Sequence, residues 1–346
     1  MNINIIENSI NFLADKFWSL PAIIFVILTS VIFTFVFNFI QIKKFFPGWK
    51  MVFSKDEPEE SSSEEKNKIS TFQAFINALS SSLGNGGVGG MAAVLVEGGP
   101  GAAFWVFVLG FFSMILRFVE VYAGLVIKSK DKNLNGPLAY ISYLPFGNFW
   151  VYFYAFAMLI YVFCAGIAMQ CNTMGLALAK MTNFLPNTIA IIFSIFVLYI
   201  LLGGSARIMK MAEIIIPIKV GAFFVGIILL LYYNFEKIPE TINFILECAF
   251  KKESFIIGTT VFTTQKAISS SFSKALNATE AGVGTASIFF GSTETKKPIK
   301  SAITSMITAF ISTDLVCAML LFCLVLTGVL KTGLQSSQLV IAAFFE

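Results

Sequence analysis

The chain has 346 residues, of which 57% are hydrophobic and 13% charged, and its formal net charge is +4. With 39 phenylalanines and a mean hydropathy of +0.81, this composition excludes an ordinary soluble domain. The sequence contains no histidine, which excludes histidine zinc sites, Ser-His-Asp triads and histidine proton relays. The five cysteines lie mostly within apolar runs and are interpreted as small core residues. We therefore expect an all-α integral membrane protein that is not an enzyme.

Apolar runs of about 20 residues recur along the whole chain, and each could cross a bilayer as a helix. The first run covers 20–40 and is followed by a charged, low-complexity loop at 55–68. The second begins after Ser70, which can cap its first turn, and continues to about Glu97. Further spans are predicted at 102–127, 149–179, 188–202, 214–233 and 302–330, and a last apolar stretch starts at 339–345.

The second span contains five glycines within residues 84–90. Each glycine costs about 1 kcal/mol relative to alanine inside a helix, so we expect the helix to be interrupted here. An interruption within a membrane must be buried or line a cavity, because its backbone groups need partners. Its carbonyls can hold a cation, and the next half-helix can hold a carboxylate at its N-terminus. Close helix packing through small residues is the alternative, and the glycines alone favour neither.

A second interrupted segment is predicted at about 258–284, where a Ser/Thr run with Lys266 precedes Gly282 and Gly284. We expect the whole stretch 254–290 to be irregular and 234–253 to be a mixed loop. A pair of glycine-interrupted segments, one in each part of the chain, is typical of the binding site of an inverted-repeat transporter.

Lysine and arginine are unevenly distributed between the two sides of the predicted membrane. One side collects those at 43–68, 128–132, 207–210 and 296–300. Because cytoplasmic loops carry the excess of basic residues, this side is predicted to be cytoplasmic and the N-terminus to lie outside. Arg117 and Glu120 are expected to form an i,i+3 pair at the cytoplasmic end of the third span.

Both interrupted segments resemble motifs of the sodium:alanine (alanine/glycine:cation) symporters. Residues 79–92 (LSSSLGNGGVGGMA) and 98–105 (GGPGAAFW) are similar to the family's first helix break, and 274–287 (KALNATEAGVGTAS) to its later motif. The resemblance extends over nearly the whole chain in one order. Further similarities lie at 69–74, Arg117 with Glu120, 136–141, Gln170 with Asn172, and 203–204.

This resemblance implies a leucine-transporter-like, inverted-repeat helical bundle with one extra N-terminal helix. Within a single membrane transport domain, 1–346, it implies the extra helix at 1–44 and a charged cytoplasmic loop at 45–69. A first five-helix repeat would cover 70–233 and an incomplete second repeat 254–346. Since the family continues with about three more helices, the chain is interpreted as C-terminally truncated, with about eight spans present.

The resemblance also implies a secondary active transporter of the plasma membrane, which imports a small neutral amino acid (alanine or glycine) with Na+ by alternating access. Na+ would bind at the broken helices; no other cofactor and no nucleic-acid partner is expected. The implied substrate-binding residues are Gly84, Asn85, Gly86, Gly87, Gln170 and Thr264. The implied ion-binding residues are Leu83, Gly86, Thr279, Glu280 and Lys219.

Several positions depart from the family's pattern and leave the substrate open. A threonine and an asparagine of the first break correspond to Asn85 and Gly87, the asparagine before Glu280 corresponds to Thr279, and the aspartate expected on the last full span corresponds to Ser312. An inactive or repurposed scaffold or receptor of the same fold is therefore one alternative.

Lys219 supports a second alternative, because charges inside membrane spans are costly and usually functional. Its ammonium could stand where sodium binds and couple transport to protons. The structural interpretation is a long side chain that reaches the interface near Glu213. Glu280 is expected to begin the helix after the second break, either as a structural residue or as a ligand.

Overall fold

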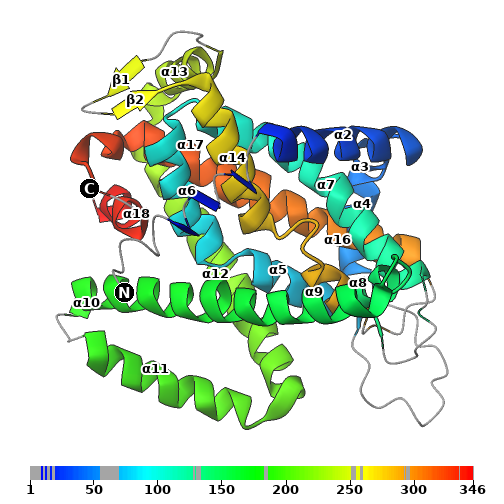
Figure 1. Cartoon of the computed structure of the whole chain (residues 1–346). Helices are drawn as coiled ribbons and strands as arrows, with labels where there is room; N and C mark the ends of the chain where they lie inside the picture. The colour runs from blue at the N-terminus through cyan, green and yellow to red at the C-terminus, as the bar shows by residue number, and fades with distance from the viewer. Residues whose placement is uncertain are drawn as a thin grey trace.

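The computed structural model describes residues 9–10, 12–13, 16–17, 20–54, 70–127, 129, 134–182, 186–250, 255–257, 260–291, 293, 297–334 and 336–345. This part of the chain is helical apart from one short hairpin (Figure 1). Within it, five helical stretches are long and apolar enough to cross a membrane. They are Thr71–Gly98, Ala102–Val126, Gly147–Ala179, Arg207–Tyr233 and Pro298–Thr327.

The N-terminal helices wrap one side of the bundle. Helix α2 (Leu20–Val36) packs against α7 (Ala102–Val126) and ends four residues before the predicted end of its span. The chain turns there because Asn38 and Phe39 adopt left-handed backbone angles. It continues as α3 (Ile40–Lys43) and α4 (Phe45–Phe53), so the predicted loop 45–69 starts with a helix, and its remainder at 55–69 lies outside the described residues.

The centre of the bundle is built on α5 (Thr71–Ser82), α6 (Asn85–Gly98) and α7. The predicted cap at Ser70 is confirmed. Its hydroxyl accepts a hydrogen bond from the Gln73 amide at 3.1 Å, and the Gln73 side chain accepts one from the Ser70 amide at 3.0 Å. This capping box satisfies two backbone donors at the helix start.

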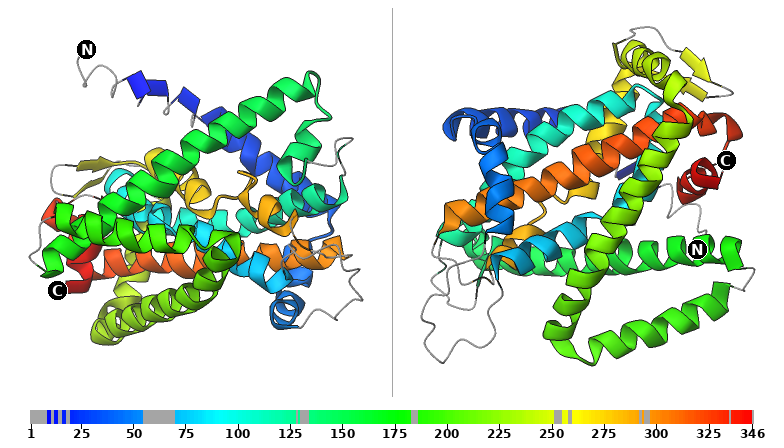
Figure 2. Two further views of the ribbon diagram at one scale, coloured as in Figure 1. Left: turned by 90° about the horizontal axis from the view of Figure 1, so that it is seen from below. Right: turned by 180° about the vertical axis from the view of Figure 1, so that it is seen from behind.

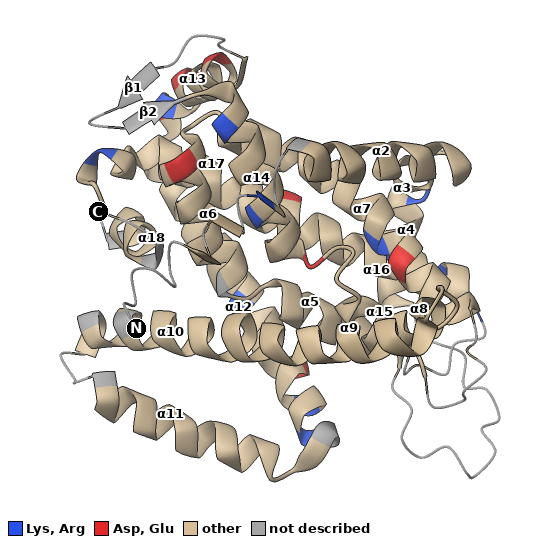
Figure 3. Cartoon of the chain, in the orientation of Figure 1, with Lys and Arg blue, Asp and Glu red and all other residues tan. Residues whose placement is uncertain are grey.

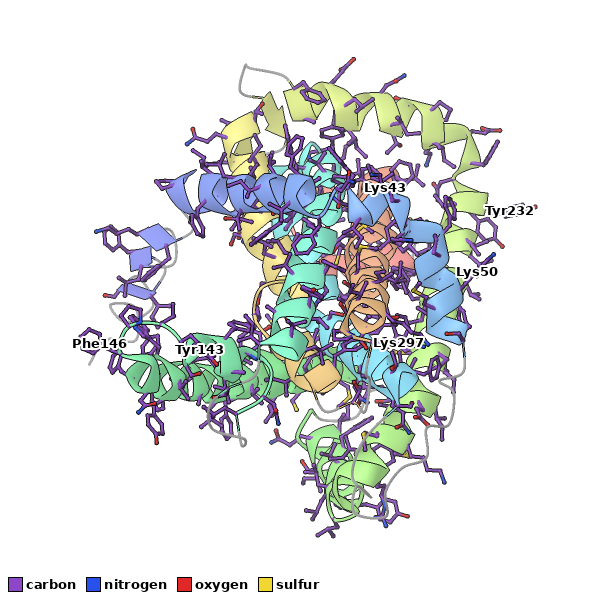
Figure 4. The ribbon with its side chains drawn as sticks, turned by 90° about the vertical axis from the view of Figure 1, so that its right-hand side faces the viewer. Lys43, Lys50, Tyr143, Phe146, Tyr232 and Lys297 are labelled. Carbon is purple, nitrogen blue, oxygen red and sulfur yellow. The ribbon has the colours of Figure 1, made fainter. Side chains whose placement is uncertain are left out.

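A peripheral arm follows, made of helices with little protein around them (Figures 1 and 2). After α8 (Pro137–Ile141), helix α9 (Gly147–Tyr161) continues through a π-helical segment, η1 (Val162–Ala168), into α10 (Met169–Thr182). Helices α11 (Pro186–Leu201) and α12 (Gly204–Tyr233) complete the arm. Charged residues are nearly absent from α9, α10 and α11 (Figure 3). Aromatic side chains such as Tyr143, Phe146 and Tyr232 point outward (Figure 4).

The segment after α12 differs most from the sequence-based expectation. A 3-10 turn, η2 (Phe235–Lys237), leads into α13 (Ile238–Phe250), so the predicted mixed loop at 234–253 was largely wrong. Helix α13 buries Thr241, Ile245, Cys248 and Ala249, whose spacing marks one helical face. Strands β1 (Phe255–Ile257) and β2 (Thr260–Phe262) then form an antiparallel hairpin in which Phe255 pairs with Phe262.

The Ser/Thr run that was predicted to be irregular is instead a helix, α14 (Thr264–Thr279), followed by α15 (Thr285–Gly291). The buried face of α14 carries the small residues Ala267, Ser271, Ala275 and Ala278. Such residues let helices approach closely, and α14 packs along α6 and α7. The small side chains therefore serve helix packing rather than a loop.

The last long helix is the most buried span, with 72% of its apolar window inside the protein. It consists of α16 (Pro298–Phe310), a second π-helical segment η3 (Ile311–Ala318), and α17 (Met319–Thr327). A 3-10 turn, η4 (Val329–Thr332), leads to α18 (Ser336–Phe345). Because α16 and η3 pack along α7, these elements form the buried centre of the bundle, next to the functional site.

Candidate functional site

The first predicted break is confirmed and is narrower than the glycine pattern suggested. Helix α5 ends at Ser82 and α6 begins at Asn85, so only Leu83 and Gly84 are unwound. Gly84 has an extended backbone, and the Gln170 side-chain amide occupies the place where a Cβ would stand. The lack of a side chain at Gly84 leaves this place to Gln170, whereas Gly86 to Gly90 belong to the helix.

The second break lies between α14 and α15, at residues 280–284. Three positive φ angles bend the chain there: 52° at Glu280, 83° at Gly282 and 102° at Gly284. Glu280 therefore ends α14, in contrast to the expectation that it begins the next helix. The confirmed interruption is shorter than the predicted stretch 258–284, because the Ser/Thr run is helical.

One cavity of about 370 Å³ lies where the two breaks meet. The first break contributes Gly84 and Gly86, and the second contributes Glu280. Gln170 on α10 and Lys219 on α12 reach the same cavity from the peripheral arm. The fold thus brings together five of the residues that the resemblance implied, from four parts of the chain.

Lys219 bonds directly to the first break. Its ammonium donates a hydrogen bond to the Leu83 carbonyl, which the end of α5 leaves without a helical partner. Leu83 and Lys219 were both implied as ion-binding residues, and the structure joins them. The lysine supplies a positive charge at the carbonyl where a bound cation was expected, and it does not extend to the interface near Glu213.

Glu280 connects both breaks through hydroxyl groups. Its carboxylate accepts hydrogen bonds from Ser81 at the end of α5, from Thr285 at the start of α15 (2.7 Å) and from Tyr161 at the end of α9 (3.3 Å). These three hydroxyls were missed in the sequence. For Ser81, the signal that could have pointed to it is the run Ser80–Ser82, which is separated from Gly84 only by Leu83.

The pair on α7 holds the second break in place. Arg117 is fully buried and donates to the carbonyl of Thr279, the last residue of α14. Glu120 accepts hydrogen bonds from the backbone amides of Gly282 (2.8 Å) and Ser287 (3.3 Å). The predicted i,i+3 pair is present, with 3.7 Å between Nη1 and Oε1. Its contacts with the break could not be seen from the spacing of the two residues.

A model described as the sodium:alanine symporter family matches residues 3–346. The chain belongs to this family. An uncharacterised transporter of Haemophilus influenzae is 29% identical over 93% of this chain and 70% of its own length. The sodium/alanine symporter AgcS of Methanococcus maripaludis is 28% identical over 94% of this chain and 73% of its own length. The amino-acid carrier protein AlsT of Bacillus subtilis is 27% identical over 94% of this chain and 68% of its own length.

Membership of the sodium:alanine symporter family confirms the resemblance seen in the sequence and the prediction of a transporter rather than an enzyme. The chain spans about 70% of the length of the relative in Haemophilus influenzae. Among the described residues, no group of three or more His, Cys, Asp or Glu side chains could hold a metal ion.

Other residues implied by the family resemblance lie away from the cavity. Thr264 is the first residue of α14, about 22 Å along the helix axis from Thr279. The hydroxyl of Thr279 is buried and donates to the Leu276 carbonyl at 3.1 Å. Gly87 does not line the cavity and lies beside Cys317 on η3. The side chain of Asn85 is outside the described part of the structure.

Proposed function

We propose that the chain forms the substrate-binding core of a secondary active transporter that imports a small neutral amino acid, alanine or glycine, across the plasma membrane by alternating access. The observation that carries this proposal is that Lys219 and Glu280, of opposite charge, line one cavity between two helix breaks. A cavity of about 370 Å³ is within the usual range for small-molecule sites. The proposed architecture is the leucine-transporter-like inverted repeat, with the richly basic side in the cytoplasm.

An amino-acid zwitterion matches the two ends of this cavity. The start of α6 reaches the cavity at Gly86, and a helix N-terminus attracts a carboxylate through its free amide groups. Lys219 adds a positive charge beside the same break, at Leu83. Glu280 offers a carboxylate to the substrate ammonium at the second break. We therefore assign the substrate carboxylate to the α6 end and the ammonium to Glu280.

A ligand panel tests this assignment on the purified protein. L-alanine and glycine should raise the unfolding temperature in a saturable way, since a ligand at 100 times its dissociation constant contributes about 2.7 kcal/mol. Propionate lacks the ammonium and ethylamine lacks the carboxylate, so each loses one of the two charge contacts. Each is expected to bind at least tenfold more weakly than alanine.

The panel also has outcomes that contradict the proposal. Equal affinities for propionate and alanine would show that Glu280 does not bind the substrate ammonium. A folded sample that no amino acid stabilises would instead favour the repurposed scaffold or receptor. Alanine exchange between the two sides of a vesicle distinguishes a transporter from a receptor, because a receptor binds its ligand without exchanging it.

Two ions are proposed as the one that drives transport, Na+ and H+. The family name favours Na+, whereas the hydrogen bond from Lys219 to the Leu83 carbonyl favours a proton carrier on this chain. An ammonium that occupies the carbonyl excludes a second cation from the same oxygen, because the two positive charges repel. Loss of the proton from Lys219 would free that carbonyl during the transport cycle.

Replacing Lys219 with methionine separates these two proposals, because methionine keeps the apolar stem and removes the charge. If Lys219 takes the place of sodium, alanine uptake by the parent protein is independent of Na+ and falls at least tenfold in K219M. Uptake should be measured in vesicles with Na+ replaced by K+ or choline, with and without an imposed pH gradient. Strict Na+ dependence of the parent protein would contradict the lysine proposal, and alanine binding measured separately keeps the transporter proposal independent of it.

A further inference from the structure

A second pocket, of about 510 Å³, lies outside the central cavity, between α3 and α4 on one side and α7 and α16–η3 on the other. Two of its lining side chains, Phe46 and Phe107, are 77% and 58% exposed, so the pocket opens to the surface of the bundle. Because the exposed rim is apolar, its favourable neighbour is lipid rather than water. Six phenylalanines line the pocket: Phe45, Phe46, Phe107, Phe111, Phe112 and Phe310.

Asp314 supplies the only charged side chain among the lining residues of this pocket. It belongs to the π-helical segment η3, half-way along the most buried span, and is 7% exposed. Its carboxylate lies against Gly110 of α7, where no larger residue would leave room for it. Its Oδ2 atom is buried and has no hydrogen-bond partner, and the ion pairs within the described residues do not include it.

Gln41 is an independent sign of a missing partner. Its side chain is 1% exposed and lines the same pocket. The amide nitrogen donates to Thr34 at 2.8 Å, whereas the carbonyl oxygen Oε1 is buried without a donor. Leaving a buried acceptor unpaired costs about 1–3 kcal/mol, and more for a charged group. Two buried, unpaired acceptor atoms, one of them on a carboxylate, thus belong to residues that line the pocket.

The chemistry of a matching ligand follows from these features. Its polar end must donate hydrogen bonds and carry positive charge, because the free polar atoms of Asp314 and Gln41 are acceptors. Its body must be apolar to pack against the phenylalanines, whose ring faces also attract cations. The volume is typical of pockets for small organic molecules, which combine apolar walls with a few polar groups. A bare metal ion would leave most of the space and its apolar wall unused.

We propose that the pocket around Asp314 is a binding site for a lipophilic alkylammonium ion that enters from the bilayer. Its ammonium donates to Asp314 and to the Oε1 atom of Gln41, and its chain lies among the six phenylalanines. The site is separate from the central cavity, and it does not depend on the function proposed for that cavity.

Octylammonium is a suitable probe for the purified full chain in a neutral detergent, with unfolding temperature as the readout. Its titration should raise the unfolding temperature in a saturable manner, whereas 1-octanol, which has the same chain without the charge, should not. The Asp314→Asn variant should bind octylammonium at least tenfold more weakly. Glu213→Gln removes a carboxylate from α12, outside the pocket, and should leave the affinity unchanged.

Two results would overturn the proposal. One is an equal effect of octanol and octylammonium with no loss in D314N, which would mark an apolar groove without ionic recognition. The other is the absence of any saturable shift with octylammonium on the folded parent protein. If D314N does not fold, Gln41→Leu and Phe111→Ala provide the same comparison, each with an expected loss of affinity of at least threefold.

Discussion

Replacing Arg117 with methionine should lower the free energy of unfolding by about 3–5 kcal/mol, which is the usual cost of removing one partner from a buried ion pair. Arg117 is fully buried, and its loss leaves the Glu120 carboxylate in the protein interior without a cation. The Thr279 carbonyl at the end of α14 loses its donor as well. Denaturant unfolding of the purified protein in micelles, followed by a helical signal, measures this effect.

A double-mutant cycle shows whether the cost comes from the unpaired charge. Glu120→Gln removes the charge and keeps one acceptor oxygen, which serves only one of the amides of Gly282 and Ser287, because these donate to different carboxylate oxygens. The R117M/E120Q double variant should therefore be more stable than R117M alone, which gives a coupling energy of about 1–3 kcal/mol. A cost below about 1 kcal/mol for R117M, or simple additivity in the cycle, would contradict the proposed role of the pair in holding the break.

Replacing Gly284 with alanine should be the most damaging change within the second break, at roughly 2–5 kcal/mol in total. Its φ of 102° is unfavourable for any L-residue with a Cβ, at about 1–2 kcal/mol. The new Cβ would also meet the ring of Pro137, with Cγ at 2.8 Å, and the hydroxyl of Tyr154. Overpacking of this kind adds about 1–3 kcal/mol.

Gly282 provides a matched control, because it lies two residues away in the same break. Its φ is 83°, and nothing lies within 4 Å of an added Cβ. G282A should therefore lose only the stability that the positive φ costs a residue with a Cβ. G284A should be less stable than G282A in the same unfolding assay. Equal stability of the two variants would show that the close approach of Pro137 and Tyr154 to the break is unimportant.

The helix breaks could be predicted from the sequence because glycine acts locally. Clusters of glycine predicted the positions of both interruptions. They also made the first break look longer than it is, since Gly86 to Gly90 are helical. The serine-rich helix α14 was missed because polarity suggested a loop. In a membrane bundle, small polar residues such as Ser271 bond to their own helix and to neighbours, here to the carbonyls of Ala267 (2.6 Å) and Ala102 (3.1 Å).

The candidate site was less predictable because its contacts join distant parts of the chain. The bond between Lys219 and Leu83 spans 136 residues, and that between Ser81 and Glu280 spans 199. Local periodicity carries no information on such pairs. The family resemblance implied Gln170, Glu280 and Thr264 as binding residues. The structure places the first two on the cavity between the breaks and Thr264 at the far end of α14.

Asp314 illustrates a further limit of sequence reasoning. The family pattern directed attention to Ser312, which has no charge, and away from the acid two residues later. Two residues correspond to about half a helical turn, so the two side chains lie on opposite faces. The structure shows that this acid faces α7 and the phenylalanine pocket, within a π-helical segment.

The uneven burial of the long helices has a consequence for work with this protein. Only 6% of the apolar window of α9–α10 and 11% of that of α12 are covered by protein, compared with 72% for α16–α17. The surrounding lipid or detergent is therefore part of the tertiary environment of the arm that carries Lys219 and Gln170. Amide hydrogen exchange in the arm should respond to detergent chain length, while the α16–α17 core exchanges at a rate set by global unfolding.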